Sequence, residues 1–319
     1  MNKCVINGAS VCAVVGLLCV LAAPSTMAAP EQTQPRTAFK VCADPNAMPG
    51  SNEQEQGFEN RIAKLFADDL GLPLQYTWFP KRLGFYRQTL KNDRTPDGSY
   101  KCDVYLHEAY GADMVALTRP YYHSSWAMVY VKGRGLDDVD SQEALANLPE
   151  ARKKSLRIGL FDRGPATDWA FKHGLIDYMV AYSGMDADLA TYPGKIIEED
   201  LVGDKINVTF VWGPVAGWTA KKLKEEKGME IALIPMKSEE GIRFDYKFAM
   251  ATRHREKEWT KQIDSLIVKH ADQIRAILSD YNIPMLSDPL SEPYVSGKDD
   301  DDDDDKPAKD RGNEKTENE

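Results

Sequence analysis

The sequence predicts an α/β protein of two lobes, in which each lobe is a βα sheet and two hinge crossings join the lobes. A strand followed by a helix occurs near the start of the chain, from Phe39, and again from Leu156. A polar, glycine-containing segment at Gly133–Gly135 separates the two patterns. A second polar crossing precedes Phe244 and returns the chain to the first lobe. A cleft between such lobes is the natural place for a binding site.

The first strand and helix organise the rest. The apolar run from Phe39 to Ala43 has the length of a buried strand, and Asp44-Pro45-Asn46 ends it. Gly71 stands where a helix end favours a left-handed residue. Ligands bind beyond the carboxyl ends of strands in open α/β sheets, so residues 44–59 are the first candidate site. The helix that ends at Gly71 is predicted by one apolar face, formed by Phe58, Ile62, Leu65, Phe66 and Leu70.

The remaining elements follow from periodicity and turn residues. Strands are expected at 72–79, 102–106, 125–131, 156–161, 176–182, 207–212, 230–234 and 244–251. Helices are expected at 81–90, 195–201 and 213–227, with a helical turn at 109–115 and a helix capped by Thr167 or Asp168 and ended by Gly174. One last long helix would carry its apolar face from Trp259 to Tyr281 and stop at Pro284.

Residues 1–28 are predicted to be a signal peptide. They contain one charge, Lys3, an apolar stretch from Val11 to Ala23, and small residues at Thr26 and Ala28 for cleavage. The alternative is an N-terminal anchor. No later segment is long and apolar enough to span a membrane. The expected organisation is therefore a soluble, exported protein with lobe 1 at 29–132 and 243–290, lobe 2 at 133–242, and a disordered acidic tail at 291–319.

Export bears on the state of the cysteines, because it removes the signal peptide and leads to an oxidising compartment. After loss of the signal peptide the chain keeps two, Cys42 and Cys102, each in a predicted strand. An even number in an oxidising compartment predicts one disulfide bond. Two buried free thiols are the alternative.

The charge is acidic. The formal net charge is −10, and residues 298–319 carry eleven acids and five bases, which places −6 of the charge in the tail. Nucleic-acid binding favours a basic face, so we expect no nucleic-acid partner. The run from Asp299 to Asp305 is expected to be a solvated, disordered tail, with weak attraction to Ca²⁺ or a basic partner surface as the alternative.

Seven segments between Phe39 and Pro284 carry a family resemblance. The segments are Val41-Cys42-Ala43-Asp44-Pro45-Asn46, Gly57-Phe58-Glu59-Asn60, Leu70-Gly71-Leu72-Pro73, Tyr76-Thr77-Trp78, Cys102-Asp103-Val104, Thr118-Arg119-Pro120-Tyr121-Tyr122 and Val211-Trp212-Gly213-Pro214. In order and spacing they resemble the type 2 periplasmic solute-binding proteins (solute-binding protein family 3-like). Within these they are similar to the MxaJ/XoxJ type found beside quinoprotein dehydrogenases of methanol oxidation.

The resemblance implies a non-catalytic periplasmic accessory protein for the maturation or activity of a methanol dehydrogenase. Its partners would be the dehydrogenase subunits, and its cleft would have room for a small-molecule ligand. The partner enzyme, not this chain, would hold pyrroloquinoline quinone (PQQ) and a Ca²⁺ or lanthanide ion.

The sequence departs from the pattern at two places. Amino-acid-binding relatives carry an Arg nine residues before the Pro of the Thr118–Tyr122 motif, where it clamps the ligand carboxylate, and here that position is Gly111. The run Tyr105-Leu106-His107-Glu108 is bulkier than the resemblance implies and would narrow or reshape the cleft. The missing clamp argues against ordinary amino-acid binding.

The cleft candidates are chosen for their place at strand ends and in the family motifs, and most have a structural alternative. Asp44 and Asn46 also suit turns, and Glu59 also suits a first helical turn. Arg119 could pair with a surface acid, and the aromatic residues could be core. The candidates are Asp44, Asn46, Glu59, Arg119, Tyr121, Tyr122, Trp126, Thr167, Trp212 and Gly213.

Catalytic motifs are missing from the sequence. It has no Gly-x-Ser-x-Gly, no His-Glu-x-x-His and no phosphate loop, and its histidines do not cluster at metal-binding spacing. His107-Glu108 is one pair that could do acid–base work. We therefore expect no enzyme and no bound metal. Two other hypotheses stay open: a solute-binding receptor of an ABC transporter, and a small-molecule lyase dependent on Glu59 or Glu108.

Overall fold

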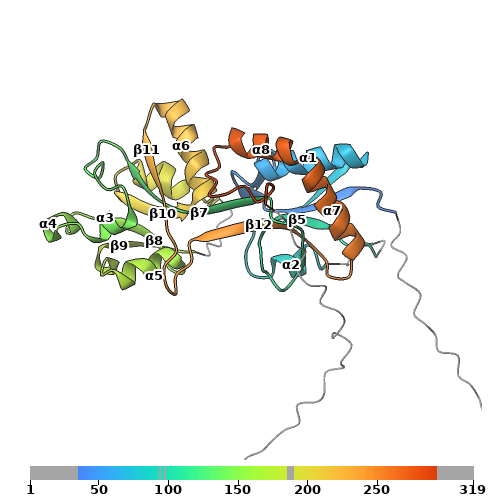
Figure 1. Cartoon of the computed structure of the whole chain (residues 1–319), viewed down its shortest axis with the longest axis horizontal. Coiled ribbons are helices and arrows are strands. Elements are labelled where there is room, and N and C mark those ends of the chain that lie inside the picture. Colours follow the sequence, from blue (N-terminus) through green and yellow to red (C-terminus); the bar gives the residue numbers. More distant parts are fainter. Residues whose placement is uncertain (1–34, 93–94, 97, 185–189, 293–319) are drawn as a thin grey trace, which may run out of the picture. The chain divides into compact units, whose positions relative to one another are not determined.

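The computed structural model describes residues 35–92, 95–96, 98–184 and 190–292 (Figure 1). The predicted signal peptide and the predicted tail from residue 293 onward lie outside these ranges. Within them, strands run in the order β4-β1-β5-β12-β7-β10-β8-β9, with β6 added beside β12 and β11 beside β7. The expected α/β class is confirmed.

The first half of this order is a mixed sheet. Strand β1 (Phe39–Ala43) lies parallel to β4 (Leu74–Trp78) and to β5 (Val104–Ala109). Strand β12 (Asp245–Thr252) lies antiparallel to β5 and to the short β6 (Ala116–Leu117). The return of the chain to this sheet through β12 agrees with the predicted second crossing.

Strand β7 (Tyr122–Val131) belongs to both halves. Its residues 122–125 pair with β12, whereas residues 126–131 pair with β10 (Val208–Trp212) and β11 (Ile231–Pro235). The parallel strands β8 (Ile158–Phe161) and β9 (Met179–Tyr182) complete the second half. The change of partner thus falls between Ser125 and Trp126, before the predicted crossing at residue 133, and the lobe boundaries stay a prediction.

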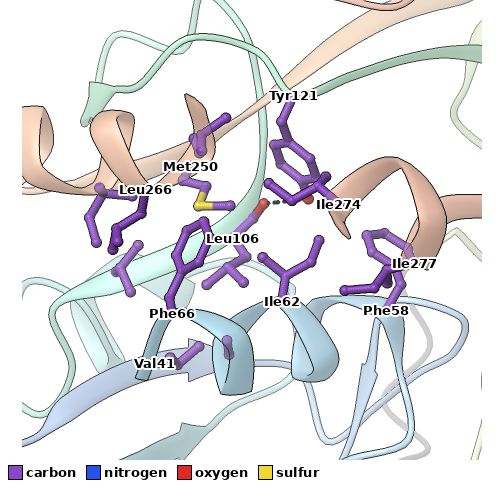
Figure 2. Packing of buried hydrophobic residues seen from close by; sticks show 14 of the residues in the cluster. Val41, Phe58, Ile62, Phe66, Leu106, Tyr121, Met250, Leu266, Ile274 and Ile277 are labelled. Atoms are coloured by element: carbon purple, nitrogen blue, oxygen red, sulfur yellow. Dashed lines mark hydrogen bonds between the residues drawn. The ribbon is translucent and has the colours of Figure 1, made fainter. Parts of the chain in front are cut away.

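Three helices cover the first half of the sheet: α1 (Phe58–Leu70), α7 (Lys257–Lys269) and α8 (Ala271–Asp280). The bounds predicted for α1 are confirmed, and Gly71 has φ 63°, the left-handed cap conformation. Figure 2 shows the apolar faces of these helices meeting over the sheet, with the Tyr121 hydroxyl donating to the carbonyl of Leu106 at 2.8 Å. The buried apolar spacing read from the sequence therefore forms this core.

The second half is built from shorter helices and one long one. Helix α6 (Gly213–Lys227) packs on β7, β10 and β11 and on the π-helical turn η2 (Ile196–Leu201). Helix α5 (Pro165–Lys172) packs on β8 and on the 3₁₀ turn η1 (Ile176–Tyr178). Two short helices precede β8: α3 (Gln142–Ala146) and α4 (Glu150–Lys153).

Several predicted boundaries are wrong. The last helix is two helices, because the chain breaks at His270 between α7 and α8. The helix at 81–90 shrinks to α2 (Phe85–Gln88), and the turn at 109–115 is not helical. Thr167 lies inside α5, whose N-cap is Gly164. The loop after β1 contains a small hairpin, β2 (Asn46–Ala47) and β3 (Ser51–Asn52).

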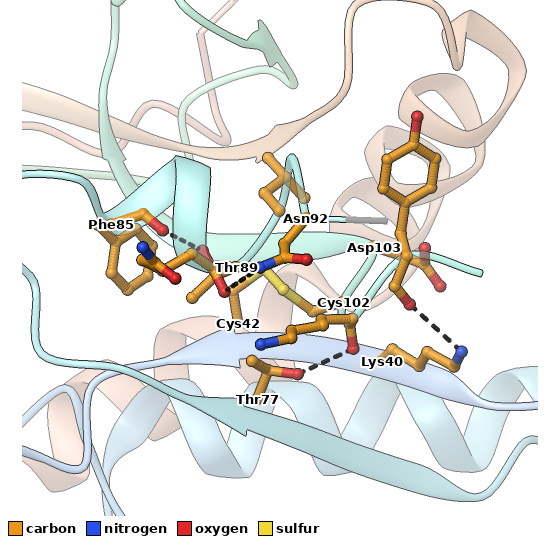
Figure 3. The surroundings of a disulfide bond; sticks show 12 residues. Lys40, Cys42, Thr77, Phe85, Thr89, Asn92, Cys102 and Asp103 are labelled. Carbon is orange, nitrogen blue, oxygen red and sulfur yellow. Dashed lines mark hydrogen bonds between the residues drawn. A yellow bond between two sulfur atoms is a disulfide. The ribbon is translucent and has the colours of Figure 1, made fainter. Parts of the chain in front are cut away.

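The predicted disulfide joins Cys42 of β1 to Cys102 just before β5 (Figure 3). Both cysteines are fully buried. Beside them, the Arg253 guanidinium donates to the carbonyls of Cys102 at 2.6 Å and Leu90 at 2.9 Å, and pairs with Asp103 at 2.5 Å. The loop 79–103 is thus fastened to the sheet covalently and by buried hydrogen bonds.

Replacing both cysteines with serine should lower the free energy of unfolding by about 4 kcal/mol, because the bridge closes a loop with a sequence separation of 60. Urea denaturation of the mature protein measures this loss. Reducing the unmutated protein should produce a similar loss, whereas the double variant should not respond to reductant. A loss below about 1 kcal/mol would contradict the assigned bridge.

Candidate functional site

A cavity of about 550 Å³ lies at the carboxyl ends of the parallel strands. The loop after β1 contributes Asp44–Ala47, and the loop after β4 contributes Pro80–Arg82. From the second half come residues at the ends of β8, β9 and β10 and the start of α6. Its position agrees with the rule that ligands in α/β sheets bind beyond strand carboxyl ends.

Four of the predicted cleft residues line this cavity: Asp44, Asn46, Trp126 and Trp212. Trp126 and Trp212 are direct partners in the antiparallel register of β7 and β10, so the sheet itself sets their spacing. The two tryptophans come from positions 86 residues apart in the chain, and only strand pairing brings them to one wall.

Asp44 also has a structural task. One carboxylate oxygen accepts the Asn46 N–H at 2.9 Å, and the other accepts the Lys81 N–H at 2.6 Å. The carboxylate therefore fixes the loops after β1 and β4 to each other. Burial raises the pKa of Asp44, although the two backbone hydrogen bonds oppose the shift.

The other six predicted residues lie away from the cavity. Arg119 forms a bidentate pair with Asp264 of α7, with Nη2 2.8 Å from Oδ2. The Thr167 hydroxyl donates to the Phe161 carbonyl at 2.5 Å. Gly213 is buried where α6 starts, and a Cβ there would lie 2.4 Å from the Ser125 carbonyl oxygen. The remaining three, Glu59, Tyr121 and Tyr122, are buried in the first half.

Glu59 and Tyr122 are joined through His107. The Nδ1 of His107 lies 2.7 Å from a Glu59 carboxylate oxygen, and its Nε2 lies 3.0 Å from the Tyr122 hydroxyl. The His107 ring also packs against Phe248, which stacks on Tyr122 with centroids 4.9 Å apart. This arrangement has the order of an acid–base relay, but none of its three members lines the cavity. We read it as a satisfied polar network inside an aromatic core.

The bulky run from Tyr105 to Glu108 affects the cavity only indirectly. Glu108 pairs with Lys81 at 2.7 Å and accepts from the Tyr86 hydroxyl, while the Lys81 ammonium lies 4.2 Å from the Tyr105 ring centroid. Burial lowers the pKa of Lys81, and the attraction of Glu108 opposes that shift. Neither His107 nor Glu108 lines the cavity, so the run shapes it by holding Lys81 rather than by filling it.

Several residues that line the cavity were not among the residues predicted from the sequence. They are Lys81, Arg82, Phe161, Arg163, Tyr182, Tyr192, Lys195 and Asp200. Phe161, Arg163 and Tyr182 stand at or just after strand ends, so the strand-end rule would have found them. Lys81 and Arg82 were assigned to a helix that starts only at Phe85. Tyr192 precedes the helix predicted at 195–201, and Lys195 and Asp200 lie within that predicted helix, so the strand-end rule does not select them.

Metal ligands and membrane-spanning helices are the next two features to consider. Among the described residues, no group of three or more His, Cys, Asp or Glu could hold a metal ion. Over the same residues, no helix has the length and apolar character needed to cross a membrane.

Comparison with known proteins identifies the fold. The crystal structure of periplasmic binding protein XoxJ from Methylobacterium extorquens AM1 superposes with a TM-score of 0.61 and 28% identity, covering 79% of this chain and all of that one. The structure of MxaJ from Methlophaga aminisulfidivorans MPT gives 0.63 and 24%, covering 78% and all of that chain. This chain has the two-lobed type 2 periplasmic binding protein fold of XoxJ and MxaJ.

Sequence relatives agree with the structural ones. Protein MoxJ of Paracoccus denitrificans is 24% identical over 265 residues, which are 78% of this chain and 90% of that protein. An uncharacterised protein encoded in the cycB 3′ region of the same organism is 61% identical over 46 residues, 14% of this chain and about half (55%) of that protein. No protein-family model matches the chain.

Amino-acid-binding proteins share the fold at greater distance. An ancestral cationic amino acid solute-binding protein superposes with a TM-score of 0.57 at 13% identity, which shows the fold alone. Gly111, the position predicted to replace the carboxylate-clamping Arg, lies in an exposed turn after β5 and does not line the cavity.

Replacing Glu59 with Ala should lower the free energy of unfolding by about 1–3 kcal/mol, because it leaves the His107 Nδ1 without its buried partner. Glu53→Ala, at an exposed position in the turn before α1, is the matched control and should change stability by less than about 0.5 kcal/mol. Equal effects of the two substitutions, measured by urea denaturation, would contradict the network.

Proposed function

We propose that this chain is a non-catalytic periplasmic accessory protein that serves the maturation or activity of a PQQ-dependent methanol dehydrogenase. The observation that carries the proposal is the match to MoxJ, XoxJ and MxaJ over most of this chain and 90% or more of each of these relatives. The segment resemblance from Val41 to Pro214 points to the same group. A periplasmic location is supported by the similarity to XoxJ, a periplasmic binding protein, and by the predicted signal peptide.

The cavity chemistry supports a role other than amino-acid capture. A receptor for an α-amino acid needs an Arg for the carboxylate and a free acid for the ammonium group. The clamp position is Gly111, and the cavity carboxylates Asp44 and Asp200 already accept hydrogen bonds. We therefore rank the partner enzyme, bound to the surface around the cavity, above an amino acid as the natural ligand.

Exposed apolar side chains supply a surface for such a partner. Leu83 is 90% exposed and directly follows the cavity residues Pro80–Arg82. Phe171 on α5 is 74% exposed. In this proposal Leu83 would contribute an apolar contact to the bound partner beside the cavity.

The metal and quinone belong to the partner in this proposal. Among the described residues this chain brings together no carboxylate cluster of the kind that Ca²⁺ or a lanthanide ion needs. PQQ and the ion would be held by the dehydrogenase, and this chain would act on that enzyme.

The second candidate is a solute-binding receptor of an ABC transporter. The cavity volume favours it, because about 550 Å³ is typical of small-molecule sites. A lyase remains the third candidate, and it would require turnover that depends on Glu59 or Glu108.

Purification of the mature protein from its native periplasm tests the proposal. Mass spectrometry should identify methanol dehydrogenase subunits in stoichiometric amounts. Recovery of a small molecule with no protein partner would contradict the accessory role and favour the transport receptor.

The substitution Leu83→Ser should reduce the recovered dehydrogenase about tenfold or more, because it removes an apolar contact beside the cavity. Val268→Ser is the matched control, since Val268 is 49% exposed on α7 and does not line the cavity. Equal recovery with the two variants would place the partner surface elsewhere.

A further inference from the structure

The described lining of the cavity has more bases than acids, in a protein that is acidic overall. Among the described residues that line it, four are bases, Lys81, Arg82, Arg163 and Lys195, and two are acids, Asp44 and Asp200. The whole chain has a formal net charge of −10. A local excess of cations against that background attracts anions to the cavity.

Asp44 and Lys81 already have partners within the chain, and Asp200 has two partners on one of its carboxylate oxygens. Asp200 accepts from the Tyr182 hydroxyl at 2.6 Å and pairs with Lys205 at 3.1 Å. Lys81 pairs with Glu108 at 2.7 Å, and Asp44 accepts the two backbone N–H groups described above.

Three cations are left for a ligand. Arg82, Arg163 and Lys195 have no ion-pair partner within 4.0 Å in the part of the chain that the structure describes. Arg82 comes from the first half of the sheet, and Arg163 and Lys195 come from the second half. A ligand with carboxylates on more than one side of its body would contact cations from both halves.

Aromatic side chains form much of the remaining wall. They are Trp126, Phe161, Tyr182, Tyr192 and Trp212. Burial raises the pKa of Tyr192 to about 12, so its phenol stays neutral and adds no negative charge. Flat aromatic surfaces favour a flat aromatic ligand by stacking or edge contacts.

We propose that this cavity binds a planar aromatic polycarboxylate, with the ring against the tryptophan wall and the carboxylates on Arg82, Arg163 and Lys195. The volume of about 550 Å³ accommodates such a ligand. This site is independent of the dehydrogenase proposal, since binding is measured on the purified chain alone.

Calorimetric titration of the full mature chain with benzene-1,3,5-tricarboxylate tests the site. Two probes separate charge from ring: propane-1,2,3-tricarboxylate has the charges without the ring, and benzene-1,3,5-trimethanol has the ring without the charges. The aromatic tricarboxylate should bind at least about tenfold tighter than either. Equal binding of the two tricarboxylates, or no heat with the aromatic one, would overturn the proposal.

Paired variants locate the binding. Arg163→Gln should weaken the aromatic tricarboxylate about tenfold, the scale of a lost charge-assisted hydrogen bond. Arg255→Gln, at an exposed position outside the cavity, removes the same charge and should leave affinity unchanged. Trp126→Leu should weaken the aromatic probe and not the aliphatic one. Thermal melting shows that each variant is folded, and equal weakening by Arg163→Gln and Arg255→Gln would mean surface attraction only.

Discussion

The continuous pairing of strand β7 is the constraint on which the rest of the structure depends. Its first residues hydrogen-bond to β12, and its last residues hydrogen-bond to β10 and β11. Backbone hydrogen bonds must be satisfied along a buried strand, so the place where its partners change is fixed. That place is Trp126, which pairs with Trp212 and lines the cavity. The strand therefore positions the aromatic wall and the two halves of the site together.

Periodicity was enough for most elements but not for their ends. The apolar faces of α7 and α8 continue one helical phase, so the sequence pattern could not reveal the break at His270. The helix predicted at 81–90 failed for another reason. Gly84 has φ 88°, a left-handed conformation that the interior of an α-helix does not contain, so the helix starts only at Phe85.

The difference between local sequence patterns and tertiary contacts also explains which site residues were predicted. Asp44 and Asn46 followed a strand whose end was correctly predicted, and both line the cavity. Tyr121, Tyr122 and Glu59 have equally suggestive sequence positions, but their side chains are buried in the first half and do not line the cavity. Lys195 lies in the cavity because the η2 turn packs on β10 and α6, and such tertiary packing leaves no local signature. The chemistry of the strand ends was thus predictable, and the direction of individual side chains was not.

The fold, the missing amino-acid clamp and the exposed apolar residue beside the cavity support one account: a binding-protein scaffold that serves a quinoprotein dehydrogenase in the periplasm. The most direct test is the methanol dehydrogenase activity of periplasm from a strain that lacks this chain. The account predicts that activity is lost on deletion and restored when the chain is supplied from a plasmid. Normal dehydrogenase activity in the deletion strain would contradict it.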